Sequence, residues 1–351
     1  MKKQIMFMAM TAMLIASCSS DDVVSTNTGR AIDFRTSVGT RGAETTTANI
    51  SKFWVTAIDE ADANYFSKQE FTKDGEFFTS SPLYYWPAGE LNFVAYSPSE
   101  TDLGATVTIN NTTKTLADFS PAAKIADQKD FVTATATGTK AANETNGVEL
   151  TFVHQLSQIE IKAKNANTGY VYKVVGVRIG KPVSKGTFTF GTNTWSLTTT
   201  EKTNYAVEYD TDPRTLAADA ATMMGTDNDN AMLLPQQLVA WTPETDKTNT
   251  KKGAYIALKI QITTKDGARV YPATATGEYD WAAVAIDTNW EAGKKYVYTL
   301  DFSNGAGKVD PEKPDPDPTD PFKPGEDILG KPIKFTVTVT DWTSADQPVT
   351  M

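Results

Sequence analysis

Few side chains in this 351-residue chain could act as a base or a nucleophile at neutral pH. His154 is the only histidine, and Cys18 is the only cysteine. A catalytic Cys–His pair and a zinc site built from these residue types are therefore excluded. Alternation places His154 on the same face as Phe152 and Leu156, which favours a buried, hydrogen-bonded imidazole over a catalytic base. We expect no enzymatic activity and no cofactor.

Other residues could bind a ligand. Residues 227–230 (DNDN) carry oxygen ligands for calcium but lack the glycine and distal glutamate of a hand-type loop, so a solvated turn is the simpler interpretation. Several aromatic residues could stack on sugars, although packing in a core explains them more simply: Tyr84, Tyr85, Trp86, Trp281 and Trp290. A pair of carboxylates suited to glycoside hydrolysis is defined by the distance between the two groups in space, which the sequence does not give. We expect no metal site, and glycan binding stays an alternative.

The setting of Cys18 predicts that it is modified. Lys2 and Lys3 precede a mostly apolar stretch over residues 5–16, the layout of a secretory signal. Residues 15–18 (IASC) match the lipobox of bacterial lipoproteins, in which small residues flank the cleavage point and the cysteine receives a diacylglycerol. The prediction is a signal peptide over residues 1–17 and a lipidated tether over residues 18–30. The alternative is an ordinary signal peptide with an incidental cysteine.

Charge and composition limit where in the cell the chain is expected and which classes of molecule it is expected to bind. The acidic stretch over residues 19–22 (SSDD) resembles a signal for the outer face of the outer membrane, or is only a solvated tether. The net charge of −10 argues against a nucleic-acid partner, because nothing would neutralise phosphates along a groove. No apolar run of membrane-spanning length follows residue 17, so we expect the lipid on Cys18 to be the attachment to the outer membrane.

Short alternating segments predict an all-β fold. β-branched and aromatic residues recur with a period of two, and Gly, Pro, Asn and Asp interrupt them, as in β-sandwiches. The expected strands cover residues 53–58, 91–96, 107–109, 158–162, 186–190, 255–262 and 296–302. Brief helices are expected over residues 118–124 and 215–224. A turn-rich stretch over residues 138–147 predicts a boundary between an N-terminal sandwich, residues 31–148, and a C-terminal sandwich, residues 149–307.

The C-terminal end combines a proline-rich segment with a well-patterned strand. Six prolines between residues 308 and 324 favour an extended path that no sheet can include, and that stretch could span roughly 50 Å. Residues 308–330 are therefore predicted to be a linker. Residues 331–351 form the C-terminal segment, in which Ile333, Phe335, Val337 and Val339 alternate with polar residues. This strand either returns to its own sandwich or is added to the sheet of another molecule.

Four segments, taken in order, resemble the fimbrillin family, the subunits of type V pili. They are residues 85–98 (YWPAGELNFVAYSP), 150–161 (LTFVHQLSQIEI), 233–236 (LLPQ) and 290–300 (WEAGKKYVYTL). With the lipobox and the final strand ending at Trp342, they span nearly the whole chain. The resemblance implies two transthyretin-like β-sandwich domains, export as a lipoprotein, and a C-terminal strand of the donor type. It also implies that other pilus subunits are the partners, and that donor-strand exchange follows removal of the first strand by an Arg-specific protease.

The N-terminal residues fit that implied mechanism. Ile32, Phe34 and Val38 alternate along a candidate first strand, which Gly39, Thr40, Arg41 and Gly42 follow as an accessible turn. Cleavage after Arg41 would release the strand together with the lipid. Cleavage after Arg30 would leave the strand in place, and Arg35 lies within it. Alternatively these arginines are only surface charges, and the chain is a lipid-anchored pilus anchor or a monomeric surface adhesin that binds a host protein or glycan.

Overall fold

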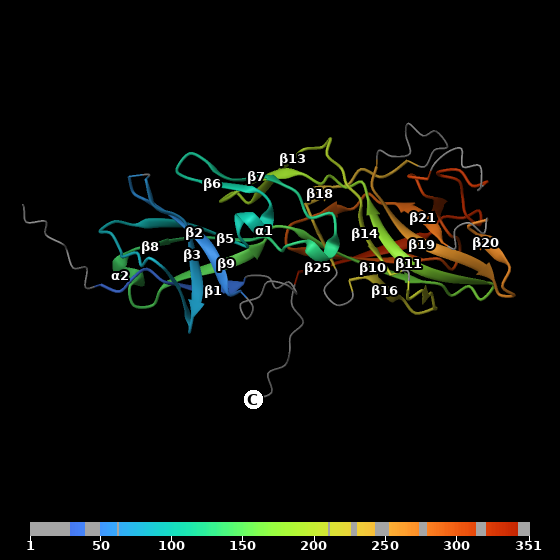
Figure 1. The fold of residues 1–351 in the computed structure, drawn as a ribbon, viewed down its shortest axis with the longest axis horizontal. Coiled ribbons are helices and arrows are strands. Elements are labelled where there is room, and N and C mark those ends of the chain that lie inside the picture. Colours follow the sequence, from blue (N-terminus) through green and yellow to red (C-terminus); the bar gives the residue numbers. More distant parts are fainter. Residues whose placement is uncertain are drawn as a thin grey trace, which may run out of the picture.

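The computed structural model describes residues 29–38, 50–61, 63–209, 211–225, 230–242, 253–273, 279–313 and 321–342. Within these ranges the chain forms an elongated body made almost entirely of β-strands (Figure 1). The exceptions are two four-residue helices, α1 (Glu100–Leu103) and α2 (Lys140–Asn143), and the 3-10 turn Ile125–Asp127. The predicted all-β class is confirmed. No helix in the described ranges has the length and apolar character needed to cross a membrane.

Seven strands of the N-terminal half close into a barrel in the order β1-β4-β3-β2-β5-β8-β9. All neighbours are antiparallel except β1 and β9, which are parallel. Alternating apolar side chains of these strands point inward and fill the barrel with one hydrophobic core. The strands are β1 (Phe34–Val38), β2 (Lys52–Asp59), β3 (Asn64–Asp74), β4 (Phe77–Ser80), β5 (Leu91–Ser97), β8 (Val132–Gly138) and β9 (Val148–His154).

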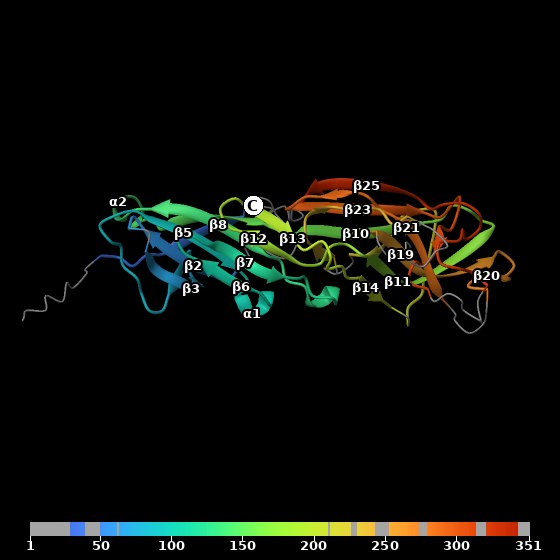
Figure 2. The ribbon, with the colours of Figure 1, turned by 90° about the horizontal axis from the view of Figure 1, so that it is seen from above.

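The C-terminal half is a sandwich of two sheets around a second core. The first sheet contains β10 (Ser157–Lys164), β16 (Ala221–Met224), β17 (Ala231–Leu233), β23 (Lys294–Asp301) and β25 (Lys334–Asp341). The second sheet contains β11 (Tyr170–Gly180), β14 (Tyr205–Glu208), β15 (Arg214–Thr215), β19 (Tyr255–Thr264), β20 (Arg269–Tyr271), β21 (Asp280–Ala285) and β24 (Lys308–Val309). A separate two-stranded sheet pairs β18 (Gln236–Gln237) with β22 (Asn289–Trp290). Figure 2 shows β25 at the rim of the body, outside β23.

A shared sheet joins the two halves. The hairpin of β6 (Thr106–Ile109) and β7 (Lys114–Phe119) pairs with the hairpin of β12 (Gly186–Thr189) and β13 (Thr194–Leu197). Under this sheet a third core mixes residues of both halves. The expected boundary between residues 148 and 149 falls at the start of β9, which belongs to the barrel, and sheet membership changes only between His154 and Ser157. The division into two separate domains stays a prediction.

The two expected helices are absent from their predicted positions, so those predictions were wrong. Residues 118–124 cover the end of β7 and the loop before the 3-10 turn, and residues 215–224 include the end of β15 and all of β16. Met223 and Met224 are buried in the C-terminal core while β16 pairs with β10. Pairing with a sheet edge and burial of two large side chains outweigh the weak helix preference of the alanine-rich stretch before them.

Candidate functional site

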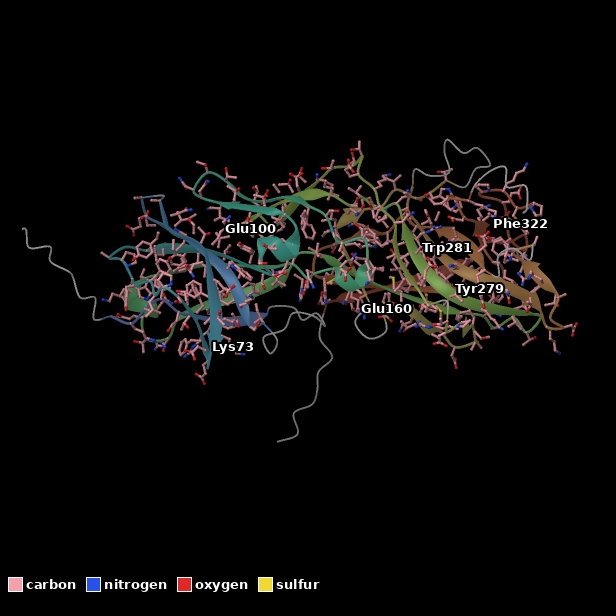
Figure 3. The ribbon with its side chains drawn as sticks, in the orientation of Figure 1. Lys73, Glu100, Glu160, Tyr279, Trp281 and Phe322 are labelled. Carbon is pink, nitrogen blue, oxygen red and sulfur yellow. The ribbon has the colours of Figure 1, made fainter. Side chains whose placement is uncertain are left out.

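Strand β1 is held unequally along its two sides. On one side all five residues pair in parallel with β9, from Phe34 opposite Val148 to Val38 opposite Phe152. On the other side only Phe34 pairs with β4, opposite Phe78. Beyond Phe34 the seam opens into a cavity of about 430 Å³ that is lined by Arg35, Thr36, Lys73, Gly75, Glu76 and Phe78. Figure 3 marks Lys73 in this half of the body. The C-terminal part of β1 is therefore bound to the barrel through one edge.

The apolar side chains of this first strand are central to the barrel core. Ile32 and Phe34 are buried, and Phe34 makes edge-on ring contacts with Phe71 at 4.7 Å and with Phe93 at 5.1 Å. The backbone of Val38 is part of β1, but its side chain lies outside the described residues. Loss of β1 would therefore remove the centre of an aromatic cluster and free the edge of β9.

Arg30 is engaged by several partners. Its backbone N–H donates to Glu144, and its guanidinium donates to the carbonyl of Thr145 and pairs with Asp33 at 2.9 Å. The guanidinium also lies 4.4 Å from the centre of the Phe77 ring. Burial raises the pKa of Asp33, and the charge of Arg30 opposes that rise. These contacts fix the backbone next to Arg30, so the bond after it is a poor substrate for a protease that needs an extended, accessible chain.

The other predicted site residues of this region lie in different settings. Arg35 is exposed but its backbone pairs with Glu149 within β1, and its guanidinium covers the same Phe77 ring at 4.6 Å. Cys18 and Arg41 lie outside the described residues. The lipidation and the cleavage therefore stay predictions.

In this structure the C-terminal strand β25 lies on its own subunit, at the edge of the first C-terminal sheet. It pairs with β23 over eight residues, with Leu300 opposite Phe335 and Tyr298 opposite Val337. The N–H of Trp342 donates to the carbonyl of Gly293 across the same ladder. Hydrogen-bonded pairs alternate in an antiparallel ladder. The backbone N–H and C=O groups of the even-numbered residues of β25 therefore bond to β23, and those of the odd-numbered residues point to the free edge of the sheet.

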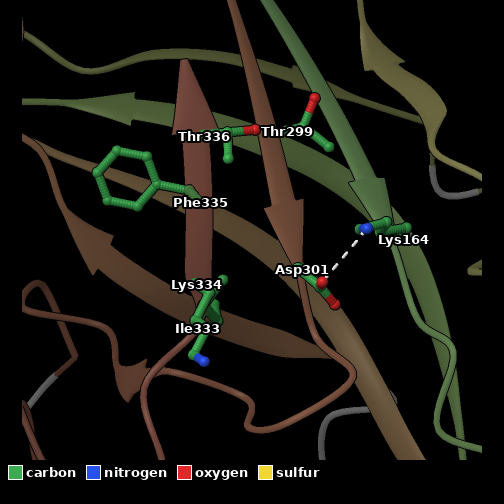
Figure 4. Close-up of a pocket in the computed structure, with 7 residues that line it drawn as sticks. All are labelled: Lys164, Thr299, Asp301, Ile333, Lys334, Phe335 and Thr336. Atoms are coloured by element: carbon green, nitrogen blue, oxygen red, sulfur yellow. Dashed lines mark ion pairs between the residues drawn. The ribbon is translucent and has the colours of Figure 1, made fainter.

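The apolar face of β25 is only partly covered. Phe335 and Val337 are half-buried against the core, and Val339 is 51% exposed. No other described strand pairs with β25. A cavity of about 510 Å³ adjoins the start of the strand, and Figure 4 shows its lining of Lys164, Thr299, Asp301, Ile333, Lys334, Phe335 and Thr336. A strand edge with free backbone groups and an incompletely buried apolar face is suited to strand exchange.

The flanks of the proline-rich segment are bound to each other. The N–H of Val309 donates to the carbonyl of Glu326, the N–H of Gly325 donates back to Val309, and Ile328 is fully buried. The structure thus brings residues 308–309 beside residues 325–327, which a linker that spans a distance would hold apart. How far the segment between them would reach when β25 leaves its subunit stays a prediction.

A buried ion pair holds the same region to the second C-terminal sheet. Arg178 pairs with Asp310 at 2.5 Å, and its guanidinium stacks 4.4 Å from the ring of Trp281. Lys313 bonds to Asp280 at 2.5 Å. Figure 3 labels Trp281 and Phe322, both in the C-terminal half of the body. Sequence reasoning missed this cluster, because Arg178 and Asp310 lie 132 residues apart in the chain, and no local pattern indicates that they meet.

His154 is buried and hydrogen-bonded, as the alternation predicted. Its side chain is inaccessible, and Nδ1 lies 3.0 Å from one carboxylate oxygen of Asp130. Among the described residues, no group of three or more His, Cys, Asp or Glu side chains could hold a metal ion. Trp290, a candidate for sugar stacking, is buried and bonded to Tyr298. The features that distinguish this molecule are therefore its first and last strands.

Comparisons with known proteins agree with this arrangement. A family model described as fimbrillin-like matches residues 38–342. The chain is 24% identical to the fimbrium subunit Fim1C of Phocaeicola vulgatus, over 88% of this chain and 94% of that protein. The crystal structure of a fimbrial protein from Bacteroides vulgatus has a similar fold, with a TM-score of 0.59 and 17% identity, over 90% of this chain and all of that one.

Proposed function

The chain belongs to the fimbrillin-like family, and from this premise we propose that it is a structural subunit of a cell-surface fimbria. In this proposal the chain is exported as a lipoprotein through Cys18. Copies assemble when the C-terminal strand of one subunit replaces the first strand of the next.

A shared side-chain pattern in β1 and β25 carries this proposal. Residues 31–38 read AIDFRTSV, and residues 332–339 read PIKFTVTV. The isoleucine, the phenylalanine and the last valine of both segments occupy the same relative positions, at a constant offset of 301 residues. The one inward position that differs is Thr36, which corresponds to Val337. Since the period of a strand is two, a strand with this pattern presents the same side chains to the same face as β1 does.

The barrel without β1 would offer a groove of matching shape. The edge of β9 would present the backbone of residues 148–152, and the floor would be the aromatic cluster around the vacated position of Phe34. A donor in the register of the shared pattern places Phe335 in that position. The unpaired edge and exposed core make the empty groove unfavourable, which drives its refilling.

The direction of exchange follows from what each strand gains. Val337 would bring an apolar side chain where Thr36 brings a hydroxyl, and each added buried methylene-sized group contributes about 0.8 kcal/mol. Val339 would also leave a position in which it is 51% exposed. The donor strand is therefore more hydrophobic than the strand it replaces and is incompletely buried at home.

We propose Arg41 as the cleavage site that starts the exchange. The alternatives are restrained, because Arg30 is held by an ion pair and Arg35 lies in a paired strand. Residue 41 lies three residues after the end of β1, and this end of the strand pairs only with β9. Cutting there by an Arg-specific protease would free the first strand, and the lipid would leave with it.

Deletion of residues 331–351 tests the proposal. The truncated chain is expected to be exported and to lose the SDS-resistant ladders that polymers of the full chain form. Replacement of Thr338 by Ala, which changes a polar residue on the outward face of β25, serves as the matched control and should leave the ladders intact. Unchanged ladders in the deletion would refute donation by the C-terminal strand.

The alternative of a lipid-anchored pilus anchor or adhesin is separated by mass spectrometry of surface-derived protein. An amino terminus at Gly42 is expected for an assembled subunit. An intact lipidated Cys18 on all of the protein would instead mean that β1 stays paired with β9 and β25 with β23. The chain would then act as an anchor or as a monomeric protein of the cell surface.

A further inference from the structure

Besides its pairing with β23, strand β25 is held by buried side chains at its two ends. Ile333 and Trp342 are buried, whereas the side chains between them are half-buried or exposed. Ile333 joins the core of the C-terminal sandwich, as the rest of the sheet does. Trp342 joins a different core, the one shared by the barrel and the connecting sheet. The end of the strand is thus tied to the other half of the molecule by one side chain.

The side chains that surround the indole of Trp342, here called its seat, include the imidazole of His154 and an apolar cluster. The indole is fully buried and stacks on the imidazole, with the ring centres 4.4 Å apart and the planes within 13°. Leu156, Met232 and Leu234 belong to the same apolar cluster. Within the described part of the chain the indole N–H finds no hydrogen-bond acceptor. A buried donor without a partner weakens the seat, so the indole is held by packing and stacking alone.

The register of β8 and β9 sets the position of the imidazole. His154 pairs directly with Val132, the first residue of β8, and Asp130 precedes that strand by two residues. The Asp130 carboxylate bonds to Nδ1 of His154 at 3.0 Å, with both side chains buried. This bond fixes the plane of the ring, and hence the surface that the indole meets. Both residues belong to the barrel half, so the imidazole on which the indole stacks and the strand that carries the indole come from opposite halves of the molecule.

We propose that Trp342 is a latch that retains the C-terminal strand on its own subunit, and that the His154–Asp130 pair positions the seat of this latch. Withdrawal of the one indole would leave β25 attached by its edge pairing with β23 and by Ile333. That the released strand is used to join another subunit rests on the proposed function, whereas retention by the latch is a property of the single molecule.

Hydrogen exchange of the full chain, measured by mass spectrometry, tests the latch. With Trp342→Ala, the even-numbered amides of β25, which bond to β23, are expected to exchange about 100-fold faster or more, the factor typical for loss of a buried tryptophan. The amides of β19 in the centre of the second sheet should keep their rate. Trp195→Leu is the matched control, because Trp195 packs against the same apolar cluster from β13 and should leave β25 unchanged.

The role of His154 as a positioning residue has its own readout. His154→Gln should accelerate exchange of β25 in the wild-type background and have no further effect on β25 when Trp342 is already Ala. If His154→Gln prevents folding, Asp130→Asn provides the same comparison with a neutral hydrogen-bonding partner. If the effects of His154→Gln and Trp342→Ala on the exchange of β25 were additive, His154 would not act through Trp342, and its role as a positioning residue would be refuted.

Two further outcomes would refute the latch itself. Unchanged exchange of β25 in Trp342→Ala would mean that edge pairing alone retains the strand. Equal acceleration of β25 and β19 would make Trp342 an ordinary core residue. If the proposed function were wrong, the result would differ: the wild-type chain would form no polymers, while Trp342→Ala would still accelerate exchange selectively in β25.

Discussion

Phe335 distinguishes the strand at rest from the strand in a polymer. In this structure its ring is half-buried at a sheet edge, 6.2 Å from the ring centre of Tyr298. In the register shared by β1 and β25 it would occupy the position of Phe34, which is fully buried beside Phe71 and Phe93. Replacement of Phe335 by Ala should therefore have a small effect on the monomer and a large effect on the assembly.

The two effects can be estimated separately. Full burial of a phenylalanine contributes about 1.5–3 kcal/mol, so loss of a half-covered ring should lower the free energy of unfolding of the monomer by about 1 kcal/mol. Truncation of a phenylalanine in a packed core costs about 3–5 kcal/mol. The difference of about 2–4 kcal/mol corresponds to an association constant that is weaker by a factor of roughly 30 to 700.

Two measurements on the same variant check this reasoning. Urea unfolding of the uncleaved chain gives the monomer effect, and the urea or temperature dependence of the SDS-resistant ladders after cleavage gives the assembly effect. Thr338→Ala controls for loss of a side chain from the outward face. Ladders of Phe335→Ala as stable as those of the wild type, or a monomer destabilised by as much as the polymer, would contradict the shared register.

Three other predictions use different parts of the molecule. Arg41→Ala should abolish the amino terminus at Gly42 in mass spectra of surface protein, while Arg30→Ala should leave it in place. Asp130→Ala removes the carboxylate bonded to the buried imidazole and should lower the free energy of unfolding by about 1–3 kcal/mol in urea titrations. Burial raises the pKa of Tyr172 and of Tyr298 to about 12. Since unfolded tyrosines ionise near pH 10, the unfolded chain loses protons first, and the melting temperature should fall as the pH rises from about 10 to 12.

Local patterns were sufficient to predict the class of the fold and nine of the 25 strands in the described residues. Alternation at residues 53–58 and 255–262 correctly predicted strands β2 and β19, although the structure buries residues on both faces of each strand. The same reasoning placed His154 in the interior. It failed at residues 215–224, where an alanine-rich stretch pairs with β10 because a sheet edge was available to it. Such pairing depends on residues about sixty positions away.

The sequence by itself determined that the first and last strands of this protein carry the same side-chain pattern, since that pattern is a property of residues 31–38 and 332–339 alone. Only the tertiary structure decided where each strand lies and how firmly it is held. The open seam beside β1, the clasped flanks of the proline-rich segment and the seat of Trp342 on His154 all join residues distant in the chain. Contacts of this kind arise from packing in three dimensions, which no local periodicity encodes.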